Sequence, residues 1–202
     1  MQYKIQAIMR EDEPGAALAL VEAFMADPLF DFLIPNDRER RRWLPHLMPE
    51  LLKQSRRGGM SRVAVDSNGC VVGALAAGPY PPRPLEGIRM MLRTTLLPWP
   101  WEPSMRHMRH VFTYMKIWDA MHERGDHAYV YIIGVHPDHQ GRGLGKHLMT
   151  TLFPANPQRP VYLETQTASN VPFYESLGFA ITGEHHPFDD GPGTWGMIRH
   201  PA

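Results

Sequence analysis

The stretch VHPDHQGRGLGKH, residues 135–147, follows the apolar run HAYVYIIGV (127–135) and precedes the helix-favouring run LMTTLF (148–153). A strand that ends in a glycine-rich turn and then opens a helix can bind an anion. Glycine lets backbone N–H groups approach oxygen atoms closely, and the start of the helix adds about half a positive charge. Arg142 and Lys146 supply full charges beside it. This stretch therefore predicts an anion site.

The spacing of the glycines excludes two of three known phosphate-binding loops. A P-loop requires G-x-x-x-x-G-K-[ST], but only three residues separate Gly141 from Gly145, and His147 follows Lys146. A dinucleotide fingerprint requires G-x-G-x-x-G near the start of a βαβ unit, whereas this chain has G-x-G-x-G late in its length. The third pattern, Q-x-x-G-x-G after a strand, fits residues 140–145 at every position.

Together with YLETQTASNVPFYESLGF (162–179), this loop resembles the GNAT acetyltransferase superfamily, whose members hold the pyrophosphate of acetyl-CoA there. The blocks GVHPDHQGRGLG, LET, NVPFYESLGF and TWGM look most like members related to puromycin N-acetyltransferase. The resemblance is clear over about residues 127–200, weak over 1–78 and absent over 79–126. It implies an α/β (α+β) fold: a mixed, mostly antiparallel sheet flanked by helices, with a V-shaped splay between two central parallel strands, 127–135 and 160–165.

The resemblance also implies how the donor, acetyl-CoA, is held. The pantetheine arm would pair with the exposed edge of the first central strand, and an N–H near its end would face the thioester oxygen. Gly134 would tolerate a bulge or a close approach there. Asn170 would bond the pantetheine or a nearby phosphate. The expected cofactor-binding residues are Ile133, Gly134, Val135, Gln140, Gly141, Arg142, Gly143, Leu144, Gly145, Lys146, Asn170 and Phe173.

Two side chains are the expected catalytic groups. Tyr174 is expected to protonate the departing thiolate, because a phenol with a pKa near ~10 is protonated at neutral pH. It follows Asn170 by four residues, so both lie on one helix face; the alternative is a tyrosine of the core. Glu164, at the end of VYLE, is the candidate base, directly or through water, although it could equally orient the loop or substrate. His127 is a second candidate, and water chains without a dedicated base are a third option.

These residues predict an acetyl-CoA-dependent N-acetyltransferase in which a small-molecule amine attacks directly in a ternary complex. Aromatic residues are frequent in residues 25–50 and 79–118, which favours a partly apolar amine over a polycation. Residues 79–126 are expected to form a variable, substrate-binding insertion. The alternatives are a non-catalytic acyl-CoA sensor or interaction module, and an acyltransferase acting on a protein or another acceptor.

The composition narrows the possible partners. The 202 residues carry 21 Lys+Arg and 21 Asp+Glu, and this balance argues against nucleic-acid and anionic-membrane binding. No apolar run reaches the ~20 residues of a membrane helix, so we expect a cytoplasmic protein. One cysteine, Cys70, precludes a cysteine zinc cluster, and the histidines form no HExxH motif, so no metal is expected. Cys70 itself is expected to be buried. A homodimer stays possible.

The order of elements predicts one domain, 1–202. A strand near 3–9 precedes a helix over 10–28 and a helical region over 37–59, which Pro45 and Pro49 are expected to kink or split. The arginine-rich start of that region is expected to be a solvated helix face. Residues 61–78 form a hairpin around DSNG, and 104–125 a long amphipathic helix. A second hairpin around DDGPG closes the chain.

Overall fold

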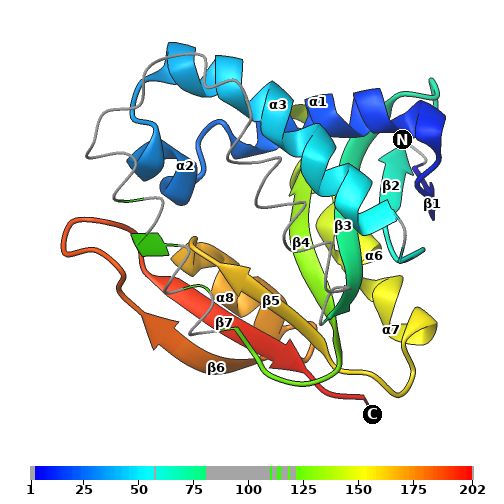
Figure 1. Ribbon diagram of the computed structural model, residues 1–202. Helices are drawn as coiled ribbons and strands as arrows, with labels where there is room; N and C mark the ends of the chain where they lie inside the picture. The colour runs from blue at the N-terminus through cyan, green and yellow to red at the C-terminus, as the bar shows by residue number, and fades with distance from the viewer. Residues whose placement is uncertain are drawn as a thin grey trace.

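The computed structural model describes residues 3–56, 58–80 and 122–201, together with residues 110, 113, 114 and 118. Within them, seven strands form one sheet in the order β1-β2-β3-β4-β5-β7-β6 (Figure 1). The central pair β4–β5 is parallel, and the other neighbouring pairs are antiparallel. The predicted fold class, a mixed and mostly antiparallel sheet flanked by helices, is therefore confirmed.

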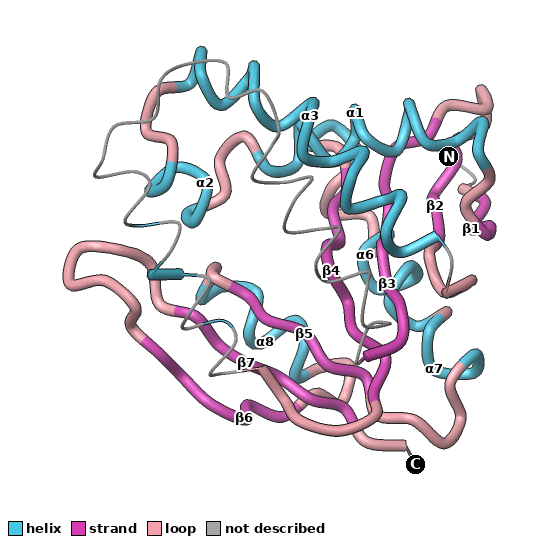
Figure 2. Tube along the Cα trace, in the orientation of Figure 1, coloured by secondary structure: helices cyan, strands magenta, loops and turns pink. Residues whose placement is uncertain are grey.

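The elements follow one another along the chain as Figure 2 traces them. The strands are β1 (Lys4–Ala7), β2 (Arg62–Val65), β3 (Val71–Tyr80), β4 (His127–Val135), β5 (Val161–Thr165), β6 (Ala180–His185) and β7 (Thr194–Arg199). The α-helices are α1 (Glu13–Phe24), α2 (Pro28–Leu33), α3 (Asp37–Arg56), α6 (Leu144–Thr150), α7 (Leu152–Ala155) and α8 (Val171–Glu175). Short 3-10 turns are η1 (Arg10–Asp12), η2 (Pro137–His139) and η3 (Ala168–Asn170).

Helices cover both faces of the sheet. Helices α1 and α3 lie on one face, where Leu20, Leu44 and Met48 pack on Ile132. Apolar residues recur in α3 every three or four positions, which gives this helix the stripe that it buries. Helices α6, α7 and α8 supply the core of the other face, to which Leu148 belongs. The sheet is thus the middle of three layers.

The parallel strands diverge soon after they meet. They pair only at Ala128↔Val161 and Tyr129↔Tyr162, near the start of each strand, and separate beyond that point (Figure 1). This opening is the V-shaped splay that the resemblance implies. Because the strand ends no longer bond to each other there, the backbone edge of β4 is left open toward the gap.

A β-bulge in β4 lies just past the point of divergence. Ala76 pairs with Ile132 and Ala77 with Val130, so Tyr131 is the extra residue. A bulge or a close approach was expected at Gly134, three residues further on, and the structure shows the second of these. Gly134 serves a close approach of α1, because a Cβ there would lie 2.9 Å from Ala23 Cβ. The bulge changes which side chains face each helix layer before the strand reaches the splay.

The first half of the chain corrects two predictions. Helix α3 runs unbroken through Pro45 and Pro49, so the predicted split does not occur. Arg38, Arg41 and Arg42 are exposed, as expected of a solvated face, but Arg40 is only 4% exposed. The Arg40 guanidinium donates to Ile34 O and pairs with Asp31 and Asp37. The arginine-rich sequence alone does not show that one of its side chains points inward, because the groups that bind it lie partly outside this run.

Both predicted hairpins are present, as β2–β3 and β6–β7. Cys70, however, is exposed rather than buried. It is the last residue of the turn, where its N–H donates to Asp66 Oδ1, and β3 begins one residue later. The predicted amphipathic helix over 104–125 lies mostly outside the described residues. Within the described part of the chain, no helix is long and apolar enough to cross a membrane.

Candidate functional site

A cavity of about 680 Å³ opens beside the end of β4, and most of the predicted donor-binding residues lie in its wall. Its wall comes from the end of α1 and the turn after it, the end of β4, the glycine loop, the start of α6, and α8 with the turn before it. The predicted residues that line it are Ile133, Gly134, Val135, Gln140, Gly141, Gly143, Leu144, Gly145, Lys146, Asn170, Phe173 and Tyr174. Arg142 and Glu164 are not among the lining residues.

The glycine loop owes its shape to two residues with left-handed backbone angles. Gly141 has φ of 71° and Gly143 of 77°, which side-chain-bearing residues rarely adopt. Gln140 closes the loop, because its Nε2 donates to Val135 O over 2.9 Å. Leu144 anchors the other end in the core at 2% exposure. The first N–H groups of α6 have no acceptor within the helix, so this turn suits an anion.

The two cations of the loop have different surroundings. Lys146 lines the cavity and is exposed. The Arg142 guanidinium instead donates to Tyr3 Oη over 2.6 Å and to Asp138 O over 3.0 Å. Tyr3 also bonds His139 Nδ1. Arg142 thereby ties the loop to the residue just before β1, while Lys146 is the cation available inside the cavity.

Tyr174 lies in α8, 6% exposed, in contact with the rings of Phe173 and Phe179. Burial raises the pKa of its hydroxyl, and the charge of Asp27 raises it further. The phenol therefore stays protonated at neutral pH. Among the described residues no hydrogen bond engages its hydroxyl. Asn170 is exposed immediately before α8 and lines the same cavity.

Glu164 belongs to a buried cluster on the other face of β5. Its side chain is 4% exposed; Oε2 accepts from Tyr129 Oη over 2.7 Å and Oε1 lies 2.9 Å from His122 Nδ1. Tyr129 is the last residue of β4 that pairs with β5, so its bond to Glu164 spans the apex of the splay. We call Tyr129, Glu164 and His122 the apex clasp. Burial, and next the Glu164 charge, hold the Tyr129 pKa well above its usual value.

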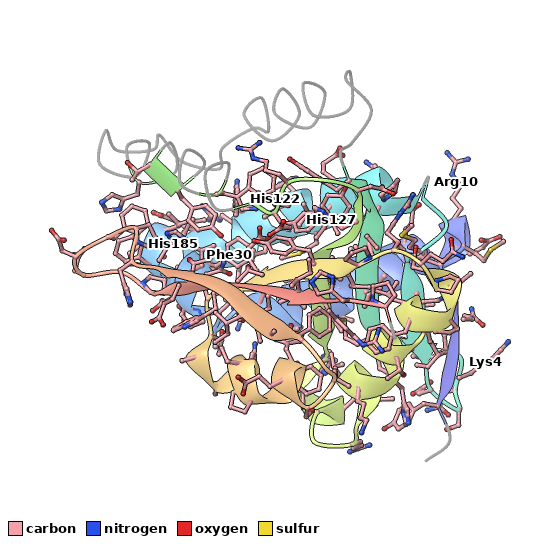
Figure 3. The ribbon with its side chains drawn as sticks, turned by 90° about the horizontal axis from the view of Figure 1, so that it is seen from below. Lys4, Arg10, Phe30, His122, His127 and His185 are labelled. Carbon is pink, nitrogen blue, oxygen red and sulfur yellow. The ribbon has the colours of Figure 1, made fainter. Side chains whose placement is uncertain are left out.

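His127, the alternative base, contacts the apex clasp through His122. It lies next to His122 (Figure 3), with 3.3 Å between the two Nε2 atoms. His127 is 1% exposed, and its ring stacks on Tyr80. Burial, helped by His122, lowers the pKa of His127 to about 4, so its imidazole is neutral at neutral pH. Within the described residues, no group of three or more histidines, cysteines or carboxylates could hold a metal ion.

Asp27 is a site residue that the sequence analysis missed. It lines the cavity from the turn between α1 and α2. Its Oδ1 accepts from Leu29 N over 3.0 Å and Phe30 N over 3.2 Å, which caps α2. Burial raises the pKa of its carboxyl, although these two N–H groups oppose the shift. The dipeptide Asp27-Pro28 is itself a helix-start signal, since Pro favours the first helical position.

Comparisons with known proteins agree with this geometry. Residues 19–179 match the model of the acetyltransferase (GNAT) family. Among solved structures, the chain is similar to a Corynebacterium glutamicum structure of "histone acetyltransferase HPA2 and related acetyltransferase" at 22% identity and a TM-score of 0.71, covering 100% of this chain and 98% of that chain.

Two further matches are named for acetylation of amines. Arylalkylamine N-acetyltransferase 2 of Aedes aegypti shares 14% identity at a TM-score of 0.73, with 100% of each chain covered. The polyamine N-acetyltransferase of Drosophila melanogaster shares 15% identity at a TM-score of 0.67, with 98% of this chain and 100% of that chain covered. At these identities the matches show the fold alone. The family model, which spans most of the sequence, shows that the chain belongs to the GNAT family of acetyltransferases.

Proposed function

We propose that this chain is an acetyl-CoA-dependent N-acetyltransferase whose acceptor is the amine of a small molecule, attacking the thioester directly in a ternary complex. One observation carries the proposal: the glycine loop, the open end of β4 and the hydroxyl-bearing Tyr174 line one cavity. Acetyl transfer from acetyl-CoA requires a site for the phosphates, a strand edge that binds the extended pantetheine arm, and a proton donor for the leaving sulfur.

The donor would lie along the wall of this cavity. N–H groups of the glycine loop and the start of α6, with Lys146, would hold the pyrophosphate. The pantetheine arm would pair with the open edge of β4 near Ile133 and Val135, as an added strand does. An N–H near Ile133 or Gly134 would then stabilise the oxyanion, and Asn170 would bond the arm. Arg142 would act through the shape of the loop.

Tyr174 would protonate the thiolate as the tetrahedral intermediate collapses. Its raised pKa keeps the phenol protonated before the C–S bond breaks, so a proton is available to the departing sulfur. Glu164 stays a candidate base. Both of its oxygens already have hydrogen-bond partners, so a proton would reach it through Tyr129 or His122.

The acceptor is proposed to be a partly apolar amine. Two of the matched structures are named for acetyltransferases of arylalkylamines and polyamines, which supports an amine as the acceptor. Phe24 and Phe173 contribute aromatic rings to the cavity wall, and this favours an apolar body over a polycation. Residues 79–126, the proposed substrate-binding insertion, lie mostly outside the described residues. A relationship to the puromycin N-acetyltransferases is part of the same proposal.

The test is the Tyr174→Phe variant, assayed by release of free CoA thiol from acetyl-CoA with a panel of primary amines. Loss of a general acid should lower kcat by about 10²–10⁴-fold. Stabilisation of the protein by acetyl-CoA in a melting experiment should not change. Equal losses of turnover and of acetyl-CoA stabilisation would contradict the acid role. Acetyl-CoA stabilisation without thiol release by the wild type would favour a non-catalytic acyl-CoA module.

A further inference from the structure

The cavity has a positively charged part and a negatively charged part. Lys146 and the free N–H groups of α6 belong to the glycine loop, which the donor phosphates would occupy. Asp27 lies in the α1–α2 turn, and Figure 1 shows α2 well apart from α6. Helix α1 brings this turn to the end of β4, where Ala23 and Phe24 contact Gly134. A carboxylate is thus held beside the strand end at which the thioester would lie.

One oxygen of Asp27 is available for a ligand. Within the described residues, the hydrogen bonds to its side chain all end on Oδ1, and no ion pair reaches it. The lining residues next to it along the chain, Phe24, Ala26 and Pro28, are apolar. A partly desolvated carboxylate with no cation beside it is costly, and a cationic ligand would relieve that cost.

We propose that Asp27 binds the ammonium group of the acceptor, so that the acceptor is a primary amine with a single positive charge next to an apolar body. This inference rests on the proposed function and adds the substrate class to it. Asp27 and Tyr174 line the same cavity, so the ammonium would be held in the cavity that also contains the proton donor for the sulfur. A second cationic group would find no second carboxylate in the described wall of the cavity.

The proton balance follows from this placement. Asp27 Oδ2 takes one proton from the ammonium and later releases it to solvent. The neutral nitrogen then attacks the thioester carbon, so a C–N bond forms. When the C–S bond breaks, the sulfur leaves with the electron pair and takes the proton of Tyr174. The phenolate is reprotonated by the second proton that the nitrogen loses. The products are the amide, free CoA thiol and one released proton.

The experiment compares the binding of two probes of equal shape, 2-phenylethylamine and the uncharged 2-phenylethanol, by calorimetry on the full chain saturated with CoA. The wild type should bind the amine at least about tenfold more tightly than the alcohol. In Asp27→Asn this preference should vanish. Asparagine caps a helix about as well as aspartate, so α2 is retained, which a melting curve verifies.

Two comparisons make the result specific. Acetyl-CoA should stabilise Asp27→Asn as much as the wild type, and Asp138→Asn, at an exposed carboxylate outside the cavity wall, should keep the preference for the amine. Equal binding of amine and alcohol by the wild type, or a preference for the amine that survives in Asp27→Asn, would overturn the inference. Thiol release with other acceptors would still support the proposed function in those cases. A wild type that acetyl-CoA does not stabilise would defeat the proposed function itself.

Discussion

The apex clasp makes a specific prediction about the splay. Tyr129→Phe removes one hydroxyl and keeps the ring, so the packing against Tyr131 and Tyr162 is retained. The variant removes the hydrogen bond from Tyr129 to Glu164 Oε2 at 2.7 Å and the acceptor of Trp118 Nε1 at 3.2 Å. Because Tyr129 belongs to the last β4–β5 pair, the loss occurs where the two strands separate.

The expected destabilisation can be worked out from these two bonds. A hydrogen bond to a charged group contributes about 1.5–3 kcal/mol to stability, and a buried donor left unpaired costs at least about 1 kcal/mol. Because the two losses are not strictly additive and water can re-enter, we expect the free energy of unfolding to fall by about 2–3 kcal/mol. For a chain of 202 residues that corresponds to a fall in Tm of about 4–12 °C.

The assay is thermal unfolding followed by circular dichroism, with urea unfolding to obtain the free energy. Tyr3→Phe is the matched control, because its hydroxyl bonds an exposed arginine and its loss should cost about 1 kcal/mol or less. If the clasp also sets the angle of the splay, the KM for acetyl-CoA should rise in Tyr129→Phe. A Tm that matches that of Tyr3→Phe would refute the reasoning about a buried carboxylate clasp.

Three other predictions follow from the structure. Gly134→Val should destabilise the fold by about 1–3 kcal/mol and weaken acetyl-CoA binding, because a Cβ at this position would meet Ala23, Leu20 and Phe24 at 2.9–3.0 Å; unchanged unfolding would contradict the close approach of α1. Gly143→Ala should cost about 1–2 kcal/mol and lower acetyl-CoA affinity, since φ is 77°; calorimetric titration measures the second effect, and unaltered affinity would argue against the loop geometry. The pKa of His127 in the folded protein, about 4, lies below the usual ~6.5, so the unfolded chain binds the proton first as the pH drops. The free energy of unfolding should therefore fall by about 3 kcal/mol between pH of about 6.5 and about 4. In His127→Gln, urea unfolding should show a smaller fall over this pH range, and an unchanged pH dependence would count against a buried neutral imidazole.

The glycine loop and the two strands that flank its helix could be predicted from local rules, whereas their parallel pairing followed from the family resemblance. The predicted glycine turn is present, with positive φ angles at Gly141 and Gly143, and residues 127–135 and 161–165 are the strands that diverge. Tyr174 reaches the cavity because four residues separate it from Asn170 at the start of a short helix. These features need no knowledge of distant parts of the chain.

The remaining features depend on contacts that no local pattern contains. Glu164 meets His122 across 42 positions and Tyr129 across 35, so its burial and its partners could not be predicted from VYLE. Arg40 turns inward because Asp31 and Ile34, on the preceding helix and its end, lie within its reach. Asp27 was assigned to the end of a helix, although it caps the next one and thereby enters the cavity wall.

The most direct test of the account is the melting temperature of the wild-type protein with and without acetyl-CoA. The proposed site binds the donor only when the chain is folded, so a ligand concentration about 100 times Kd should add about 2.7 kcal/mol. For a chain of this length that predicts a rise in Tm of about 5–10 °C. The same Tm with and without saturating acetyl-CoA would contradict the central claim that this cavity holds acetyl-CoA.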